Sequence, residues 1–461
     1  MDASNADVDE WEDEVRQGFL GDRLKIVDTT GIFSRCIRWC ECMNHEMEVV
    51  PQDLQLLHAH FYPATSDRPS TAFTFNVLDE FAIDALECKT AALTFLSKLC
   101  RQTDRVFPLS TANVYAAFMR CSRQWRNLMN LKRAGIAHDN PTRSPGDLAL
   151  FCVSCPQPGK NVTIEEVKLS ADFKLYRPQI VVDGNFKLEN LKMRNPEDDV
   201  RLSDGQMFFV GSVLYDEHVR ITPEQKQRSN CNNHRAVNET NVKRKEVDST
   251  GIGACACARH GFFRQLPPEI KQMLLMYDIS CQWVLRWIQR FKEGKYLFYR
   301  KDLELFAAVG KFHLGAHILE CFWEFSLNFM EGSGQVDGEI LETLWAALDK
   351  VVGSTRSMSR AHRQEVLDDY MNDSNWKKMV GLVSSQHAPA TINSDDLCSP
   401  CFDRQNGSSY CWLASTQDAF DELSIRVGKD ITEKWAKEER DALAPGGIGR
   451  KIYKAAGTDG L

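Results

Sequence analysis

Acidic side chains stand at three places where a buried element of this 461-residue chain ends or begins. Asp183 follows the apolar run Ile-Val-Val, and Asp278 follows Met-Leu-Leu-Met-Tyr, so each is expected at the end of a buried strand. The third place is the helical sequence DGEILETLWAALD, which offers Glu339 and Glu342. Open α/β sheets bind ligands at the carboxyl ends of their strands. Three such carboxylates can hold two divalent metal ions, Mg²⁺ or Mn²⁺, for phosphoryl transfer.

The two glutamates differ in their predicted orientation on this helix. At about 100° per residue, Glu342 lies roughly 100° from the centre of the apolar face, and Glu339 lies roughly 160° from it. We therefore favour Glu342 as the third acid. Position 339 has a structural alternative, because a helix N-terminus favours negative charge. The apolar face is formed by Leu341, Leu344, Trp345, Leu348 and Val352.

The cysteines indicate metal binding or burial rather than disulfide bonds. The first twenty residues are acidic, unlike a secretory or mitochondrial signal, so a reducing compartment, the cytosol or nucleus, is expected. Sixteen cysteines in that setting are not read as a disulfide framework. Cys152-x2-Cys155 has the spacing of half a zinc site, but the sequence does not identify its partners.

A complete zinc site is predicted further along the chain. His313, His317 and Cys321 are spaced by four residues, which places them on one face of a predicted helix. The first and third lie about 12 Å apart along such a helix, so they cannot share one ion. We predict zinc at His313 and His317, completed by Cys255 and Cys257. The alternative is that these are hydrogen-bonded core histidines and inert core cysteines.

The charge distribution indicates a surface for nucleic acid. The net charge is −8, but residues 1–14 alone hold seven acids. From Arg105 to His138 the chain has six bases and no acid, a pattern that fits contacts with phosphates. An ordinary solvated basic face is the alternative. The predicted DNA-binding residues are Arg120, Arg123, Arg126, Lys132 and Arg133.

Hydrophobic periodicity predicts the elements that must position these groups. Helices come first, strands follow residue 152, and helices return after residue 278, which indicates an α/β core. The predicted helices cover residues 75–102, 112–132, 279–291, 309–325 and 337–352. The predicted strands cover residues 178–188, 207–214, 251–263 and 272–278.

Several longer sequences resemble the fungal KDZ-type (Kyakuja-Dileera-Zisupton) transposases. They include VVDGNFKLENLKMRNPEDDVRLSDG, GIGACACARHGFF, YDISCQW, KFHLGAHILEC and FSLNFMEGSGQVDGEILETLWAALDKVV. Upstream, CIRWCECMNHEMEVVPQDLQLLHAHFYPATSDRPSTAFTF and QWRNLMNLKRAG resemble the CxC-type cysteine-cluster domain that accompanies them. The resemblance implies a DDE enzyme with an RNase H-like fold, in which Asp183 and Asp278 are the two aspartates. It leaves Glu342 and Glu339 as alternatives for the glutamate.

The resemblance also sets the expected domain organisation. Residues 1–30 are predicted to be a disordered acidic tail, 31–150 a truncated cysteine-cluster domain of α+β type, and 151–382 the RNase H-like catalytic domain, a mixed sheet flanked by helices. Residues 383–461 are predicted to hold an irregular insert and a C-terminal helix. DNA is the expected partner, and the Lys-Arg-Lys run at 243–245 hints at the nucleus. No apolar run could span a membrane. The oligomeric state is not determined, and a homo-oligomer is compatible with the sequence.

One connection is shorter than the resemblance implies. Arg264–Gln272 must join a third strand to a parallel fourth strand three positions away, where family members have a longer segment. Nine residues reach about 30 Å, whereas the path returns ~17 Å along the strands and crosses ~14 Å of sheet. No crossover helix fits. We therefore expect one uncovered sheet face, a poorly held Asp278 and weak or absent turnover; a non-catalytic DNA- or chromatin-binding protein is the alternative function.

Overall fold

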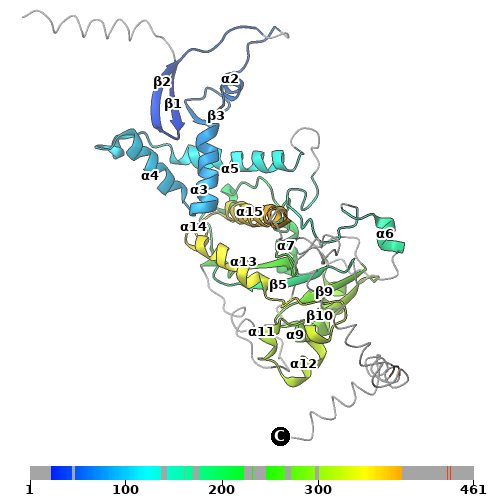
Figure 1. Ribbon diagram of the computed structural model, residues 1–461. Helices are drawn as coiled ribbons and strands as arrows, with labels where there is room; N and C mark the ends of the chain where they lie inside the picture. Colours follow the sequence, from blue (N-terminus) through cyan, green and yellow to red (C-terminus); the bar gives the residue numbers. More distant parts are fainter. Residues whose placement is uncertain are drawn as a thin grey trace, which may run out of the picture. The chain divides into compact units, whose positions relative to one another are not determined.

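The chain forms two compact units, each with its own sheet and helices. The computed structural model describes residues 22–43, 47–136, 143–159, 161–169, 176–222, 231, 246–264, 271–295, 301–386, 433 and 437. The N-terminal unit comprises Met1–Arg143 with Val200–Ser203, and the C-terminal unit comprises Ser144–Asp199 with Asp204–Leu461. Figure 1 labels their elements. No helix in the described part of the chain has the length and apolar character needed to cross a membrane.

The N-terminal unit packs helices against a small mixed sheet with strand order β2-β1-β4-β3. Its core is aromatic: the rings of Phe95 and Phe118 stack with centroids 5.7 Å apart, and Phe81 meets Phe118 edge-on at 4.8 Å. All three side chains are buried. The strands are β1 (Asp22–Asp28), β2 (Gly31–Ile37), β3 (Phe61–Pro63) and β4 (Thr71–Thr74), and the helices are α2 (Gln52–His58), α3 (Phe75–Cys88), α4 (Ala92–Thr103) and α5 (Tyr115–Arg133).

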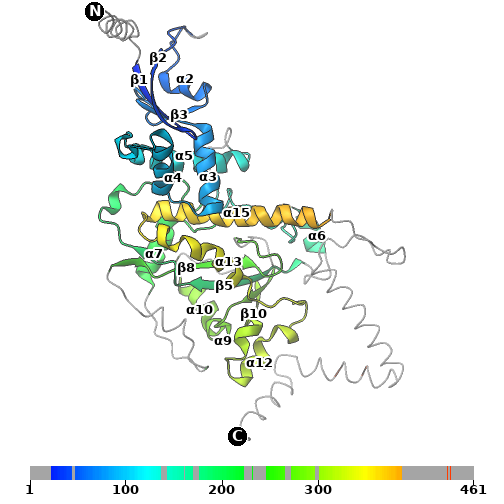
Figure 2. The same ribbon diagram turned by 60° about the vertical axis from the view of Figure 1, so that its left-hand side comes forward.

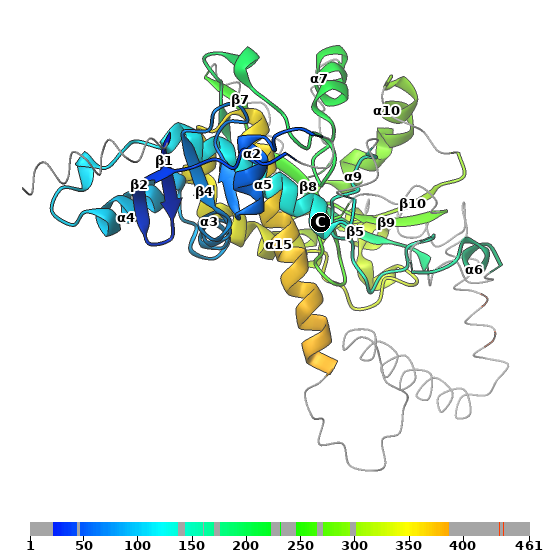
Figure 3. The same ribbon diagram turned by 90° about the horizontal axis from the view of Figure 1, so that it is seen from above.

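The main sheet of the C-terminal unit combines antiparallel and parallel pairing, with strand order β10-β9-β5-β8 among the described residues (Figure 3). Strand β5 (Gln179–Asn185) pairs antiparallel with β8 (Ile252–Cys257) and parallel with β9 (Gln272–Met276). Strand β9 in turn pairs parallel with β10 (Glu304–Ala308). A two-stranded sheet joins β6 (Asn190–Leu191) to β7 (Val247–Ser249).

The register of the β5–β9 pair sets the position of the two aspartates. Val181 is paired with Met276. Because both strands run in the same direction, Asp183 and Asp278 each follow two residues later, at the same edge of the sheet. Asp278 follows β9 as predicted, whereas Asp183 lies within β5, two residues before its end and beyond its pairing with β9.

Both faces of this sheet are covered. On one face Trp283, from helix α9 (Ser280–Trp283), packs against Ile180 and Met273. On the other face helix α13 (Ile340–Leu348) lies between the sheet and the long helix α15 (Arg360–Gln386) (Figure 2).

Polar contacts dock the far end of α13 on strand β5. Asp349, which follows α13, accepts hydrogen bonds from Asn185 Nδ2 at 2.7 Å and Lys187 Nζ at 2.6 Å. Near the middle of the helix, the indole of Trp345 packs against Phe263. The expectation of an uncovered sheet face is therefore wrong.

Three predicted elements need correction. Residues 22–30 are not part of a disordered tail, because Asp22–Asp28 form β1 with Leu24 and Val27 buried. The predicted strand 207–214 is instead an irregular segment followed by helix α7 (Ser212–Ile221). The predicted helix of residues 75–102 is two helices, because Lys89 adopts a left-handed conformation between them.

The region around the third and fourth strands differs further from the prediction. Residues 251–263 form a hairpin, in which β8 turns back so that Phe263 bridges Ala256. The predicted helix 309–325 is two short helices, α11 (Lys311–Leu314) and α12 (Leu319–Phe325), and strand β10 precedes them. Short apolar sequences with two glycines do not distinguish a helix from a strand–turn–helix path.

The short connection does not prevent assembly of the sheet. Although residues 265–270 lie outside the described part of the chain, β9 pairs with β5 in register. The expectation that Asp278 is poorly held is wrong. The Lys-Arg-Lys run at 243–245 and the predicted irregular segment and helix beyond residue 386 also fall outside the description, apart from residues 433 and 437.

Asp368 is a buried acid on α15 that holds the irregular segment before α7. Its Oδ1 accepts hydrogen bonds from the backbone N–H groups of Phe208 and Phe209, at 2.9 and 3.2 Å. Burial raises the pKa of Asp368 to about 7 despite these bonds, and the charges of Asp369 and Glu365 raise it further. The folded protein therefore binds this proton more tightly than the unfolded chain does.

We predict that the unfolding free energy falls as the pH rises from about 4 to 7, by a few kcal/mol at most. The variant Asp368→Asn keeps the acceptor oxygen but cannot ionise, so it should flatten this dependence in urea titrations at pH 5 and 7.5. Glu320→Gln, at an exposed position on α12, serves as the control. A pH dependence unchanged in Asp368→Asn would contradict the assignment.

Candidate active site and metal centres

Four carboxylates gather at the carboxyl edge of strands β5 and β9. Asp183 lies on β5, Asp278 follows β9, and Glu339 and Glu342 lie at the start of α13. The indole N–H of Trp345 donates to Asp183 Oδ2 at 2.7 Å, which ties the strand acid to the helix that brings the glutamates. The structure thus brings together every acid that the sequence predicted for catalysis.

His313 joins this group, which sequence reasoning did not anticipate. Its Nε2 lies 3.5 Å from Asp278 Oδ2 and 3.3 Å from Glu339 Oε2. The other oxygen of Glu339 accepts a hydrogen bond from the backbone N–H of Phe312 at 3.1 Å. Asp278, His313 and Glu339 each offer a ligand atom within 4.8 Å of the others, the separation expected for a shared metal ion.

Burial and like charge both disfavour ionised carboxylates in this group. Burial first, and then the charges of the other three acids, raise the pKa of Asp278 to about 6, against the opposing effect of His313. Burial and then Asp183 also raise the pKa of Glu342. The hydrogen bond to Glu339 raises the pKa of His313 to about 9, with Asp278 contributing. The four acids therefore share one electrostatic field.

Glu339 lies outside the regular helix on which the two glutamates were predicted. Helix α13 begins at Ile340, so Glu339 is the residue before the helix, with φ −115°. Its backbone N–H donates to Asp337 Oδ1 at 3.0 Å, and its side chain is directed toward His313 and Gly310. Glu342 lies one turn further on and is more exposed. The predicted orientation of Glu339, away from the apolar face of the helix, is wrong. Helix α13 begins at Ile340, so the helical wheel does not apply to the preceding residue.

These residues fit divalent cations of the Mg²⁺ and Mn²⁺ type. Carboxylate oxygens are the ligands that these ions prefer. Burial, together with the charges of the neighbouring acids, disfavours the ionised form of Asp278. A bound cation would neutralise that charge and favour ionised carboxylates.

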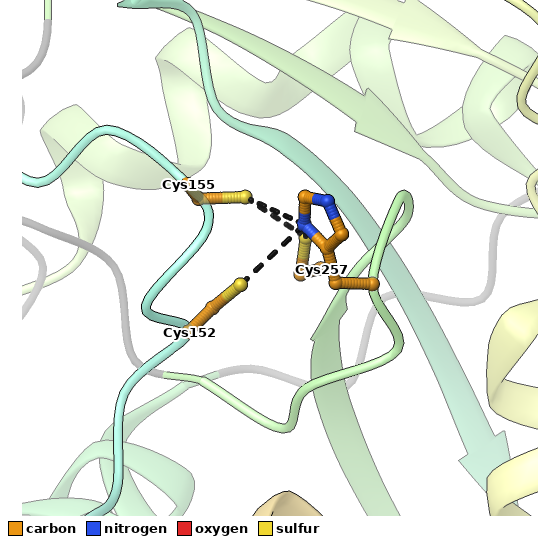
Figure 4. A group of neighbouring side chains, drawn as sticks. Cys152, Cys155 and Cys257 are labelled. Atoms are coloured by element: carbon orange, nitrogen blue, oxygen red, sulfur yellow. Dashed lines mark hydrogen bonds between the residues drawn. The ribbon is translucent and has the colours of Figure 1, made fainter. Parts of the chain in front are cut away.

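A separate cluster of one histidine and three cysteines lies at the base of the β8 hairpin (Figure 4). Cys152 and Cys155 come from a loop, Cys257 ends β8, and His260 lies in the hairpin turn. Figure 4 shows the sulfur atoms of the two loop cysteines directed toward Cys257. His260 Nδ1 lies 3.5, 3.3 and 3.6 Å from the sulfurs of Cys152, Cys155 and Cys257.

This Cys152 cluster favours an ionised sulfur. Hydrogen bonds from Cys152 and Cys155 hold the pKa of Cys257 well below its usual range, against the effect of burial. Burial acts to lower the pKa of His260, but hydrogen bonds to Cys152 and Cys257 raise it to about 11. A buried thiolate is a metal ligand.

A second cluster of the same composition lies beyond β9 and β10. His317 Nδ1 lies 3.4 Å from the sulfurs of both Cys231 and Cys281. The sulfurs of Cys231 and Cys321 are 3.9 Å apart. Except for Cys231, which is partly exposed, these residues are buried.

The predicted zinc site of His313, His317, Cys255 and Cys257 is wrong. Three of these four residues do belong to potential metal-binding groups, but to three different ones. Cys257 joins the Cys152 cluster, and His317 joins the Cys231 cluster. His313 faces the carboxylates instead, because α11 ends before His317 and the two histidines do not share a helix face. Cys255, two residues before Cys257 on β8, joins neither cysteine–histidine cluster and packs against the Ile180 core.

Two signals in the sequence indicate part of this arrangement. Cys152-x2-Cys155 and Cys257-x2-His260 each have the two-residue spacing of half a zinc site, so they could have been combined. Nothing comparable identifies Cys231 or Cys281, whose partners are distant in sequence.

The basic segment is only partly available for DNA. The Arg120 guanidinium donates to Ala64 O and that of Arg123 to Val200 O, both at 2.7 Å. Arg126 is half-buried, whereas Lys132 and Arg133 are exposed at the end of α5. In the N-terminal cysteine region, Cys36, Cys40 and Cys42 are exposed and join no ligand group found in the described part of the chain.

Family comparisons agree with this architecture. Residues 176–267 and 265–375 match the family model described as Kyakuja-Dileera-Zisupton transposase. Residues 14–106 match the model described as CxC2 like cysteine cluster associated with KDZ transposases. These matches confirm the resemblance to KDZ transposases and their cysteine-cluster domain that was seen in the sequence. No curated protein and no solved structure matches the chain.

The position of Glu339 depends on a glycine. Gly310 has φ −58°, which any residue adopts, but a Cβ at this position would collide with the Glu339 carboxylate. Gly315, five residues later, has no atom within 4 Å of such a Cβ. Gly310→Ala should therefore displace Glu339 and weaken Mn²⁺ binding at least about tenfold in calorimetric titrations, while Gly315→Ala should bind like the parent. Equal affinity in the two variants would contradict the role of Glu339.

Proposed function

We propose that this protein is a DNA transposase that cuts or joins phosphodiester bonds with Mg²⁺ or Mn²⁺. The observation that carries the proposal is the gathering of Asp183, Asp278 and Glu339 at one sheet edge within the region that matches the transposase family. Cations held by these carboxylates would activate the attacking water or 3′-hydroxyl and stabilise the leaving oxygen.

An RNase H-like catalytic core is part of this proposal. The arrangement of the sheet supports it: β8 runs antiparallel to β5, and β9 and β10 follow in parallel on the other side. The acids lie at the carboxyl ends of β5 and β9 and at the start of the helix that covers the sheet, where open α/β folds bind ligands.

The chain's own side chains orient the acids. Trp345 holds one oxygen of Asp183, and the Phe312 N–H holds one oxygen of Glu339. His313 lies between Asp278 and Glu339 and is within reach of both. Three of the four carboxylates are thus contacted by groups from helices α11 and α13, so the site is organised before a nucleic acid binds.

We further propose Glu339, rather than Glu342, as the third principal carboxylate. Glu339 is the glutamate that shares His313 with Asp278, and its side chain is 19% exposed. Glu342 takes part in the same field but lies nearer solvent. We assign it a supporting role.

We also propose that the protein binds DNA and acts in the nucleus. The exposed bases at the end of α5 support a DNA contact in the N-terminal unit. The Lys-Arg-Lys run at 243–245 is the sequence feature that supports nuclear import.

Metal-dependent cleavage of labelled DNA tests the acids. Asp278→Asn and Glu339→Gln should each lower the rate by at least about a hundredfold, because each removes a charge that holds the cation. Glu342→Gln should retain more activity than either. Glu320→Gln, an exposed acid on α12, should cleave like the parent.

The same assay separates the alternative function. The two matches to the transposase family meet at residues 265–267, within the short connection. A parent chain that binds DNA without any cleavage in Mg²⁺ or Mn²⁺ would favour a non-catalytic DNA-binding protein. Restoring a segment of family length between Arg264 and Gln272 would then show whether the connection is the cause.

Salt dependence tests the DNA contact. Each phosphate that the protein neutralises releases counterions, so the slope of log K against log salt counts the contacts. Replacing Lys132 and Arg133 with Ala should reduce this slope by up to about two units. Replacing Arg23 and Lys25, two exposed bases on β1, should leave it unchanged. Equal slopes in both double variants would place the contact elsewhere.

A further inference from the structure

We propose that the two clusters of three cysteines and one histidine are structural zinc centres, and that the second one positions the catalytic acids. The first is Cys152, Cys155, Cys257 and His260, and the second is Cys231, Cys281, His317 and Cys321. In both, one ligand atom from each residue lies within 4.8 Å of the others.

The distances in both clusters match tetrahedral zinc. Zn–S bonds of about 2.3 Å and Zn–N bonds of about 2.0 Å imply about 3.5 Å between sulfur and nitrogen and about 3.8 Å between two sulfurs. The sulfur–nitrogen separations are 3.3–3.6 Å in the first cluster and 3.4 Å in the second. Sulfur pairs lie 3.2 Å apart in the first cluster and 3.9 Å apart in the second, both far from a disulfide bond.

The first centre would connect the loop of Cys152 and Cys155 to the β8 hairpin. Two side chains hydrogen-bond to backbone carbonyl groups of this loop: Gln157 Nε2 donates to Cys152 O, and Asn161 Nδ2 donates to Cys155 O, both at 2.8 Å. On the other side, the Cys257 N–H donates to Phe262 O and closes the turn that contains His260. Four ligands from two braced segments leave no open position, which is typical of a structural site.

The second centre lies next to the acidic site along the chain. Cys281 follows Asp278 by three residues, and His317 follows His313 by four. A metal at this centre would join the segment after β9 to the segment after β10. These are the two segments that bring Asp278 and His313 to within 3.5 Å of each other.

Packing around the second centre supports this positioning role. Cys281 and Cys321 share a small core with Val309 and Phe325, and the Val309 N–H donates to Phe325 O at 3.0 Å. That core is small, so a bound ion would supply much of the restraint on these two short segments. The positioning role rests on the proposed catalytic function, whereas zinc binding itself does not.

Metal content of the purified full-length chain tests the zinc assignment. The parent should contain two zinc ions per chain by elemental analysis, and its cobalt-substituted form should show the visible absorption of tetrahedral thiolate coordination. Cys155→Ser and Cys321→Ser should each lose one ion. Cys255→Ala, on the same strand as Cys257 but outside both clusters, should keep both ions.

The parent measurements do not depend on whether a variant folds. A parent chain without zinc, and without the tetrahedral cobalt spectrum, would overturn both centres. A parent chain with one ion would overturn one of them, and the serine variants would show which.

Mn²⁺ binding, followed by electron paramagnetic resonance, tests the positioning role without requiring DNA cleavage. Cys321→Ser should weaken Mn²⁺ binding about tenfold or more, and Cys155→Ser should leave it unchanged. If Cys321→Ser loses zinc but binds Mn²⁺ like the parent, the positioning role is wrong and the zinc centre stands. If the parent binds zinc but no Mn²⁺, the catalytic proposal fails and the zinc assignment stands.

Discussion

The parallel pairing of β9 with β5 is the constraint on which the acidic site depends. Because Val181 is paired with Met276, the register fixes the positions of Asp183 and Asp278 along the two strands. A shift of one residue would turn one of them to the other face of the sheet. The buried apolar residues on both strands oppose such a shift, because it would remove Leu274 and Met276 from the packing that buries them.

Like charge at this edge makes the site unfavourable for the isolated fold. Burial and neighbouring acids raise the pKa of Asp278 to about 6, so the carboxylates repel one another where they meet. The surrounding contacts hold them in place: Trp345 on Asp183, the Phe312 N–H on Glu339, and His313 between the acids. A bound cation would relieve this repulsion.

The two cysteine–histidine clusters lie in segments that have little regular structure of their own. The segments that follow β8, β9 and β10 are short helices and turns, such as α11 with four residues and α12 with seven. Helices of this length are not stable by themselves. Cross-links through the proposed zinc ions would restrain these segments, in addition to the small cores around Phe262 and Phe325.

Much of the candidate site could be predicted from the sequence because its signals are local. Apolar runs that end in Asp183 and Asp278, and the amphipathic pattern of α13, indicate the acids and their elements directly. The family resemblance, confirmed by the two matches, connected them to transposition. Helical periodicity likewise predicted a helix over residues 112–132, which the structure shows as α5.

Other features were decided only by the tertiary structure. The choice of Glu339 depends on where α13 begins, which a helical wheel cannot show. His313 and His317 serve different sites because a break between α11 and α12 separates them. Cys155 meets Cys257 across 102 positions, and Cys231 meets Cys321 across 90. Periodicity indicates which face a residue occupies within one element. Ligand groups form where several elements pack together. For this physical reason the sequence alone indicated the residue types that could bind metal, but not which of them lie together.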